Sequence, residues 1–342
     1  MIKLWEFGLR LLALVLGCLL SGLVVTSPAA AQQIWFSPQP RLGGGADYME
    51  LFRPDAPWQR AASHVQMFEV SGHSILGSPP ADFMPEADLR QMFSDLQRRH
   101  IGLEIGVEPL TAPGPRGPTN CAYHVEGYGG PLPLGVAQRA KALGAEPQFF
   151  GTDEPLYFGH VFGSPDGKHG CHASIAELAS DVANVVRQVR TVFPGMRFGD
   201  VEPLTFQPGD PWFQNDRWLS DLSNWFDAYQ AAVGDRLAFF RIDMWWTKWW
   251  QPHLPALAAL LARKGIPLQL IYNGDGQDRT DATWIAHAVA HFKEFELGPW
   301  PKPAVAVFQY WTPNPTHVLP ESNPLTATGL IDRYVQWQQT GR

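Results

Sequence analysis

The sequence predicts a single α/β domain that folds as a (β/α)8 barrel of the TIM type. Short apolar segments alternate strictly with longer amphipathic segments, and this order indicates parallel strands covered by helices. The alternation gives eight strand–helix units and ends on a helix. Residues 1–31 are expected to be a signal peptide that is cleaved off, which leaves 311 of the 342 residues, a suitable length for one such barrel. No change in composition along these residues marks a second domain.

Eight segments are expected to form the strands. Seven are short and apolar and end in a polar or acidic residue, as buried parallel strands often do. The first strand, Ile34–Ser37, is less marked and precedes a short helix near Asp47–Phe52. The other seven are His64–Val70, Gly102–Glu108, Glu146–Glu154, Met196–Glu202, Leu237–Trp246, Pro267–Gly274 and Ala304–Trp311.

Helices are expected between the strands because apolar residues recur there at three- and four-residue spacing. Pro194-Gly195 and Gly265 stand where two of these helices must stop. The expected helices are Pro85–Ile101, Ser174–Phe193, Asp216–Val233, His253–Lys264, Ala282–Phe295 and Thr326–Gln336. An open doubly wound sheet is the alternative fold, but the sequence lacks the Gly-rich phosphate turn that such folds often carry.

In a parallel barrel the functional groups collect at the carboxyl ends of the strands, and alternation along each strand predicts which side chains face the lumen. Leu103, Ile105 and Val107 mark one face of their strand as apolar, so Glu104 and Glu108 are expected to face inward. In the expected strand Met196–Glu202, Val201 is assigned to the outer face. The inward residues expected on the later strands are Asp200, Glu202, Arg241, Asp243, Trp245, Gln269, Asn273 and Gln309, with Asp275 just beyond a strand end and Trp311 on the rim.

One phrase occurs three times at expected strand ends: Glu108-Pro109-Leu110, Glu154-Pro155-Leu156 and Glu202-Pro203-Leu204. Proline ends a strand because it lacks the backbone N–H that a ladder needs. This motif could have a purely structural role, which is to end a strand. Three inward carboxylates at one mouth would repel one another and cost stability, which favours a functional reading.

The barrel, the expected signal peptide and the strand-end Glu-Pro resemble the (β/α)8-barrel glycoside hydrolase superfamily. Many of its retaining members carry Asn-Glu-Pro at the end of the fourth strand, where Thr152-Asp153-Glu154-Pro155 stands in this chain. Asp153 replaces the Asn, and adjacent Asp-Glu instead resembles the substrate-assisted, hexosaminidase-like families. The penultimate strand has Asn273 and Asp275 where the first group has its nucleophilic Glu.

The resemblance implies a glycoside hydrolase that acts on a poly- or oligosaccharide, with Glu154 as general acid and Glu202 as nucleophile or base. Asp153, adjacent to Glu154, would raise its pKa, or would orient a 2-acetamido group in a substrate-assisted reaction. If Glu154 and Glu202 are not the catalytic carboxylates, Glu108 and Asp243 are the next candidates. Expected substrate-binding residues are Glu108, Asp200, Arg241, Asp243, Trp245, Asn273, Asp275, Gln309 and Trp311.

Two other functions stay open. A barrel with the same surface would bind carbohydrate without turnover. A metal-dependent hydrolase would use Asp153, Glu154, Asp200, Glu202 and a histidine as ligands. The sequence has no His-x-His or His-Glu-x-x-His phrase, so we expect neither a metal nor another cofactor.

Residues 1–31 are expected to be a secretory signal peptide. Lys3 and Arg10 flank the charged start, Leu11–Val25 is apolar but short for a membrane span, and Ala29-Ala30-Ala31 offers small residues for cleavage. A lipid anchor at Cys18 is the alternative, with a poor motif match. We expect a periplasmic or secreted protein without stable membrane association after cleavage.

Charge and cysteine content narrow the partners. The chain has 26 Lys+Arg and 33 Asp+Glu, a net charge of −7, which gives little reason to bind nucleic acid. Its 14 Trp and 31 Pro suit rigid loops with aromatic contact surfaces, and we expect a monomer. Cys121 and Cys171 are expected to form a disulfide in an oxidising compartment. The alternatives are free thiols or a metal site with His169 and His172.

Overall fold

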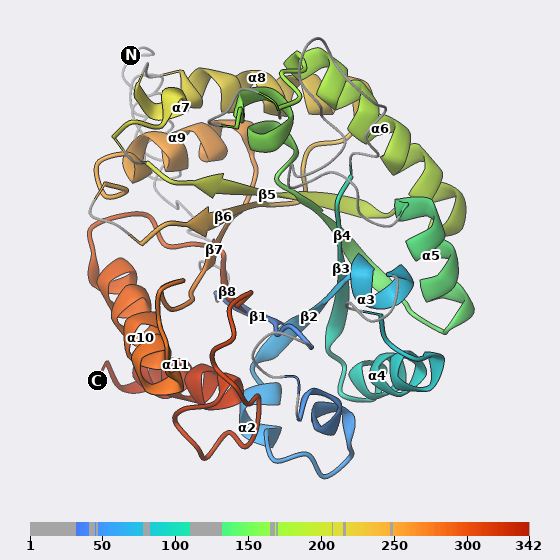
Figure 1. Ribbon diagram of the computed structural model, residues 1–342, viewed down its shortest axis with the longest axis vertical. Helices are drawn as coiled ribbons and strands as arrows, with labels where there is room; N and C mark the ends of the chain where they lie inside the picture. The colour runs from blue at the N-terminus through green and yellow to red at the C-terminus, as the bar shows by residue number, and fades with distance from the viewer. Residues whose placement is uncertain are drawn as a thin grey trace, which may run out of the picture. The chain divides into compact units, whose positions relative to one another are not determined.

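The computed structural model describes residues 32–341, except 41–44, 46, 78–82, 110–131, 165–167, 169, 207, 215–216 and 247–248. The expected signal peptide, Cys18 and Cys121 lie outside these residues and stay predictions. Eight parallel strands form a closed barrel in the order of the chain, with the helices outside it (Figure 1). The predicted (β/α)8 fold is confirmed.

The strands pair only with their neighbours in the chain, and β1 also pairs with β8 to close the ring. All the predicted strands are present, with small shifts at their ends. They are β1 Gln33–Ser37, β2 Val65–Ser71, β3 Gly102–Val107, β4 Pro147–Asp153, β5 Arg197–Leu204, β6 Phe240–Met244, β7 Leu268–Ile271 and β8 Val305–Gln309.

Six long helices follow the predicted segments: α4 Glu86–Arg98, α6 Ile175–Val192, α8 Trp218–Val233, α9 Leu254–Lys264, α10 Asp281–Leu297 and α11 Ala327–Thr340. The short helix expected near the first strand is η2 Tyr48–Phe52. Sequence analysis missed α5 Pro133–Ala142 and the shorter α2 Gln59–Ala62, α3 Gly72–Leu76, α7 Pro211–Gln214 and η3 Tyr157–Val161.

Local chemistry sets several of the helix ends. The Ser174 side chain accepts a hydrogen bond from Glu177 N, and the Glu177 carboxylate accepts one from the Ser174 backbone N–H, so this capping box begins α6. Gly265 follows α9 with φ 64°, a left-handed conformation that glycine adopts at low cost. The predicted stop at Gly265 is thus confirmed.

The apolar side chains form two clusters. The larger lies between the strands and the surrounding helices. The smaller fills the lumen, where Trp35 packs against Phe149 and Phe239 with ring centroids 5.3 Å apart in both pairs. This lumen cluster is Trp35, Met67, Phe149, Val201, Phe239, Ile271, Val305 and Val307. The barrel is therefore a packed core, and in such barrels the active site lies at the carboxyl ends of the strands.

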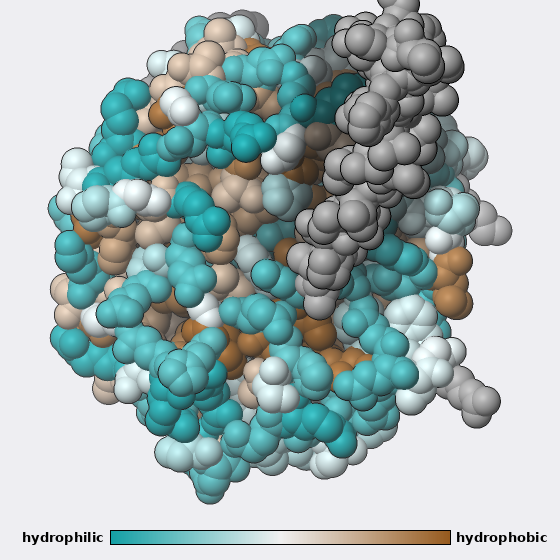
Figure 2. Space-filling model, turned by 180° about the vertical axis from the view of Figure 1, so that it is seen from behind, coloured by the Kyte–Doolittle hydropathy of each residue, from teal (hydrophilic) through white to brown (hydrophobic). Residues whose placement is uncertain are grey.

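The surface seen in Figure 2, from behind the view of Figure 1, is mainly hydrophilic with small hydrophobic patches between polar side chains. No helix among the described residues is long and apolar enough to cross a membrane.

Candidate active site at the carboxyl end of the barrel

A cavity of about 90 Å³ lies at the carboxyl ends of the strands, and we call it the mouth cavity. Strands β1 to β5 and β8, or the residues just after them, supply its walls. It is lined by Gln39, Glu69, Ser71, His73, Gly106, Val107, Glu108, Gly151, Asp153, Val201 and Gln309. Three of these eleven residues are carboxylates, Glu69, Glu108 and Asp153, so the cavity is acidic.

The strands place these three carboxylates on the inner face of the barrel. Glu69 lies on β2, two residues beyond the lumen-filling Met67. Glu108 follows β3, and Asp153 is the last residue of β4. A side chain at Gly106 would come within 2.8 Å of Glu69 Oε1. The glycine on the neighbouring strand therefore leaves the space that the Glu69 carboxylate occupies.

Glu108 has a basic partner within the cavity. His73 Nε2 lies 2.9 Å from Glu108 Oε1, and the two side chains are 38% and 19% exposed. His73 is held in place because its backbone N–H donates to Ser71 Oγ, the N-cap of α3, at 3.2 Å. The predicted inward orientation of Glu108 is confirmed.

Glu69 connects the cavity to an ion cluster whose other members, Arg241, Glu104 and Gln269, are buried. Arg241 donates to Glu69 Oε2 and Glu104 Oε2 at 2.6 Å each, and to Gln269 Oε1 at 2.9 Å. Burial, opposed by Arg241 and aided by Glu69, raises the pKa of Glu104 to about 8. A protonated Glu104 leaves one negative and one positive charge in the cluster. Arg241 faces the lumen as predicted, and its side chain is fully buried in this cluster, so its predicted role in substrate binding stays a prediction.

The prediction for β5 has the wrong face inward. Val201 belongs to the lumen cluster and lines the mouth cavity. Asp200 therefore points outward, where it accepts hydrogen bonds from Trp225 Nε1 of α8 at 2.7 Å and from Thr152 Oγ1 at 3.1 Å. Burial raises the pKa of Asp200 to about 7, against these two hydrogen bonds.

Glu202 shares this outer face and is also completely buried. Its carboxylate accepts the backbone N–H groups of Leu156 and Tyr157 at 2.7 and 2.9 Å. Burial raises its pKa well above the usual value, and Asp200 adds to the shift. Glu202 therefore holds the chain that leaves β4, and its predicted place in the lumen as nucleophile or base is wrong.

The adjacent carboxylates Asp153 and Glu154 have different surroundings. Asp153 lines the mouth cavity and is half-buried. Glu154 is only 4% exposed, takes a left-handed backbone with φ 49°, and is absent from the cavity wall. Its backbone N–H donates to Val201 O at 2.9 Å, which continues the pairing of β4 with β5 by one residue. Of these two adjacent carboxylates, Asp153 therefore lines the mouth cavity and Glu154 does not.

The other predicted site residues are spread around the strand ends. Gln309 lines the cavity, and half-buried Asp243 follows Arg241 on the same face of β6. Trp245 and Trp311 are 51% and 41% exposed just beyond β6 and β8. Trp245 thus lies on the rim and not in the lumen.

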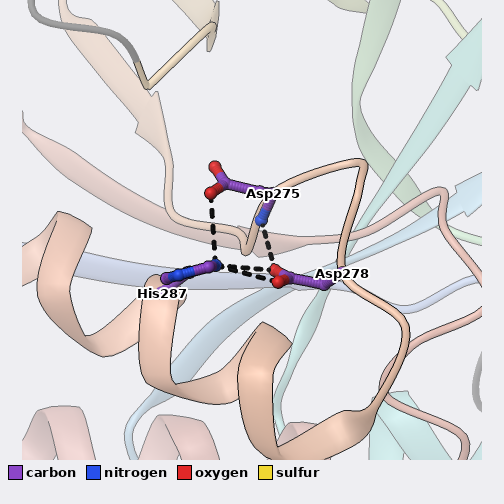
Figure 3. A group of neighbouring side chains, drawn as sticks. All are labelled: Asp275, Asp278 and His287. Carbon is purple, nitrogen blue, oxygen red and sulfur yellow. Dashed lines mark hydrogen bonds and ion pairs between the residues drawn. The ribbon is translucent and has the colours of Figure 1, made fainter.

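Asn273 and Asp275 lie apart from the mouth cavity. Asn273 is buried, and its Oδ1 accepts from Trp246 Nε1 at 2.9 Å. Asp275 and Asp278 lie in the segment after β7, and Asp275 is beside His287 of α10 (Figure 3). Neither residue lines the cavity, so their predicted binding roles are not supported by its geometry.

Sequence analysis missed Glu69, Ser71, His73 and Gln39 as site residues. The first two share the inner face of β2 with Met67, so alternation from Met67 would have found them. His73 lies beyond the strand in an unpredicted helix, and no pattern indicated it. Cys171 is buried, and its bridge to Cys121 stays a prediction.

No protein-family model and no curated protein matches the sequence. Solved structures with a similar fold include a glycoside hydrolase family 30 subfamily 8 xylanase from Clostridium acetobutylicum, at 11% identity, TM-score 0.47, and coverage of 90% of this chain and 71% of that chain. Another is a mannohexaose complex of β-mannanase from Thermomonospora fusca, at 12% identity, TM-score 0.47, and coverage of 81% of this chain and 77% of that chain. A third is an HpcH/HpaI aldolase from Desulfitobacterium hafniense, at 9% identity, TM-score 0.38, and coverage of 81% of this chain and 86% of that chain.

Glycoside hydrolases are among these neighbours, but all three TM-scores are below 0.5, so the neighbours carry no argument about function. The aldolase among them has a different chemistry, and a shared barrel fold hosts many activities. Function is therefore inferred from the mouth cavity.

Proposed function

We propose that the chain is an exported glycoside hydrolase that acts on a poly- or oligosaccharide, with Asp153 and Glu108 as its carboxylate pair. The mouth cavity carries the proposal, because it brings these two side chains from neighbouring strands into one small wall. Glycoside hydrolysis needs one carboxyl group that keeps its proton and one that is ionised. The proposal keeps the predicted reaction and replaces Glu154 and Glu202 with residues that reach the lumen.

The surroundings assign different roles to the two carboxylates. His73 Nε2 lies 2.9 Å from Glu108 Oε1 and orients this carboxyl group in the cavity, so Glu108 is the nucleophile or base of the proposal. Asp153 lies at the end of the neighbouring strand and lines the same cavity, so it is the general acid of the proposal.

The cavity is small for a ligand site, since typical pockets measure roughly 300–1,000 Å³. It therefore suits the reacting part of a substrate, while the rest lies on the open rim. The exposed rings of Trp245, Trp249 and Trp311 follow strand ends on this side of the barrel. Sugars use such flat apolar faces beside polar groups.

Gln309 adds a polar contact to this surface. Its Oε1 atom is buried and has no hydrogen-bond partner among the described residues. Buried polar atoms are rarely left without a partner. A sugar hydroxyl in the mouth cavity would donate to this oxygen.

The test is hydrolysis by the mature protein, prepared by export from the full chain. Polysaccharides are screened by the release of reducing ends, and substrates that respond are then tested with Glu108→Gln. We expect activity in the parent and a loss of at least about a hundredfold in the variant. Glu86→Gln is the matched control, because this exposed glutamate on α4 is remote from the strand ends in sequence and lies in the first turn of a helix. Binding of a sugar without release of reducing ends would contradict the proposal and favour the non-catalytic barrel.

A further inference from the structure

A second group of polar side chains lies after β7, away from the walls of the mouth cavity. Asp275 and Asp278 come from the segment between β7 and α10, and His287 comes from α10 (Figure 3). His287 Nδ1 lies 3.1 Å from Asp275 Oδ2 and 2.9 Å from Asp278 Oδ1. One atom from each of the three residues lies within 4.8 Å of the others.

These separations suit ligands of a single metal ion. Zinc binds imidazole nitrogen and carboxylate oxygen at about 2.0–2.2 Å. Two ligand atoms at that distance from one ion are about 3.0–3.5 Å apart, for angles between octahedral and tetrahedral. The two measured distances from His287 lie at or close to this range.

His291 is a second histidine beside this group, although it is not part of the set whose ligand atoms all lie within 4.8 Å of one another. It stands four residues after His287, so both rings lie on one side of α10, and they stack with centroids 6.2 Å apart. His291 is 8% exposed. Its Nδ1 lies 2.8 Å from the backbone oxygen of Asn273, which only accepts, so Nδ1 carries the proton.

The other nitrogen of His291 is left for a ligand. Nε2 faces Asp275 Oδ1 at 3.7 Å, too far for a hydrogen bond. Trp246 stacks on the ring at 4.5 Å and 6°, which fixes its orientation. Metal-binding histidines commonly have this arrangement, with one nitrogen bonded to a backbone carbonyl and the other aimed at the ion.

We propose that Asp275, Asp278, His287 and His291 bind one divalent transition-metal ion, with zinc preferred. Two carboxylates neutralise the charge of the ion, and two imidazoles favour zinc over magnesium or calcium, which prefer oxygen ligands alone. The phrase His287-Ala-Val-Ala-His291 presents two histidines at the helical spacing of known zinc sites, without the glutamate of His-Glu-x-x-His.

Solvent reaches this site, because the side chains of Asp275 and His287 are 44% and 46% exposed. Asp278 is buried, and its Oδ2 accepts the backbone N–H of Asp275 at 2.8 Å, so part of the site is preformed. A bound ion would fasten residues 275–278 to α10. No residue of the mouth cavity is a ligand, so the site stands independently of the proposed hydrolysis.

The experiment uses the mature protein without a histidine tag, stripped with a chelator and titrated with zinc by calorimetry. We expect one site per chain with a dissociation constant below about 10 μM. At zinc a hundredfold above that constant, Tm should rise by about 5 °C. Manganese should bind more weakly, and magnesium and calcium weakest.

His287→Gln is the diagnostic variant, since its half-exposed ring is dispensable for packing. It should fold with the parent's circular dichroism and bind zinc at least tenfold more weakly. His317→Gln is the control, because His317 is 55% exposed and pairs with Asp47, which is not a residue of the cluster. Absence of stoichiometric zinc binding in the parent, or full affinity in folded His287→Gln, would overturn the proposal. The group would then be an ion-paired triad in which protonated His287 bridges two carboxylates.

Discussion

Glu108 and Glu202 stand in the same three-residue phrase, yet they lie on opposite faces of the barrel wall. Glu108 follows the inner face of β3, lines the mouth cavity and pairs with His73. Glu202 lies on the outer face of β5, fully buried, and accepts two backbone N–H groups. The expected strand end at Glu202 is wrong, because Glu202, Pro203 and Leu204 are still part of β5, whereas Glu108 follows the end of β3. The Glu-Pro-Leu motif therefore does not determine where its carboxylate points.

The position of the apolar residues explains the difference. In β3, Leu103, Ile105 and Val107 pack outward, which leaves the glutamates inside. In β5, Phe198 packs outward and takes Asp200 and Glu202 with it, because they share its face. Val201 fills the lumen instead. An inner carboxylate at the mouth meets solvent and substrate, whereas an outer one must be satisfied by protein donors.

The largest effect on stability is expected at the ion cluster of Arg241. Arg241→Met would leave Glu69 and Glu104 without the cation that joins them. Removing one partner of a buried ion pair costs about 3–5 kcal/mol, so the free energy of unfolding should fall by that amount in guanidinium titrations. Arg190→Met, which removes the partly exposed pair with Asp235, should cost less than about 1 kcal/mol. Equal losses in both variants would contradict the buried cluster.

The two glutamates of the shared phrase should differ in what their loss does. In Glu202→Gln an amide N–H₂ would face a backbone N–H, so one of two buried hydrogen bonds is lost. We expect a decrease of about 1–3 kcal/mol in the free energy of unfolding. Glu108→Gln gives up a partly exposed pair and should cost less than about 1 kcal/mol. The reverse order in chemical denaturation would break the comparison between the inner and outer carboxylates.

The smallest effect is expected for Glu104→Gln at pH 5, where the amide replaces a protonated carboxyl group of similar shape. The difference in the free energy of unfolding should be below about 1 kcal/mol there. Burial raises the pKa of Glu104 from 4.5 to about 8, so between these values the folded state keeps a proton that the unfolded state has released. The stability of the parent should therefore fall relative to the variant as the pH rises through this window. Parallel stability curves from pH 5 to 8.5 would show that Glu104 is ionised throughout.

Most of the fold was predictable because its patterns are local. Each apolar strand and most amphipathic helices could be read from a window of 6–20 residues, and parallel alternation implied the barrel. Helix α5 was missed because Pro133–Ala142 is rich in alanine and only weakly amphipathic. Alternation also placed Glu108 and Gln309 correctly, because apolar neighbours marked the other face.

The site was less predictable because it depends on packing between distant segments. On β5, Val201 and Phe198 offered opposite assignments, and only the lumen packing with Trp35 and Phe149 decides between them. His73 meets Glu108 across 35 residues of sequence through a short helix. The histidines of α10 were read as helix residues, since their carboxylate partners come from a separate segment.

The most direct test of the central claim compares the two adjacent carboxylates at the end of β4. Asp153 lines the mouth cavity and Glu154 does not, so they separate the geometric assignment from the motif-based one. On a substrate that the parent cleaves, kcat/KM of Asp153→Asn should fall by at least about a hundredfold, and that of Glu154→Gln by less than about tenfold, with both variants folded. A hundredfold loss in Glu154→Gln with near-parental activity in Asp153→Asn would contradict the account and restore Glu154 as the acid.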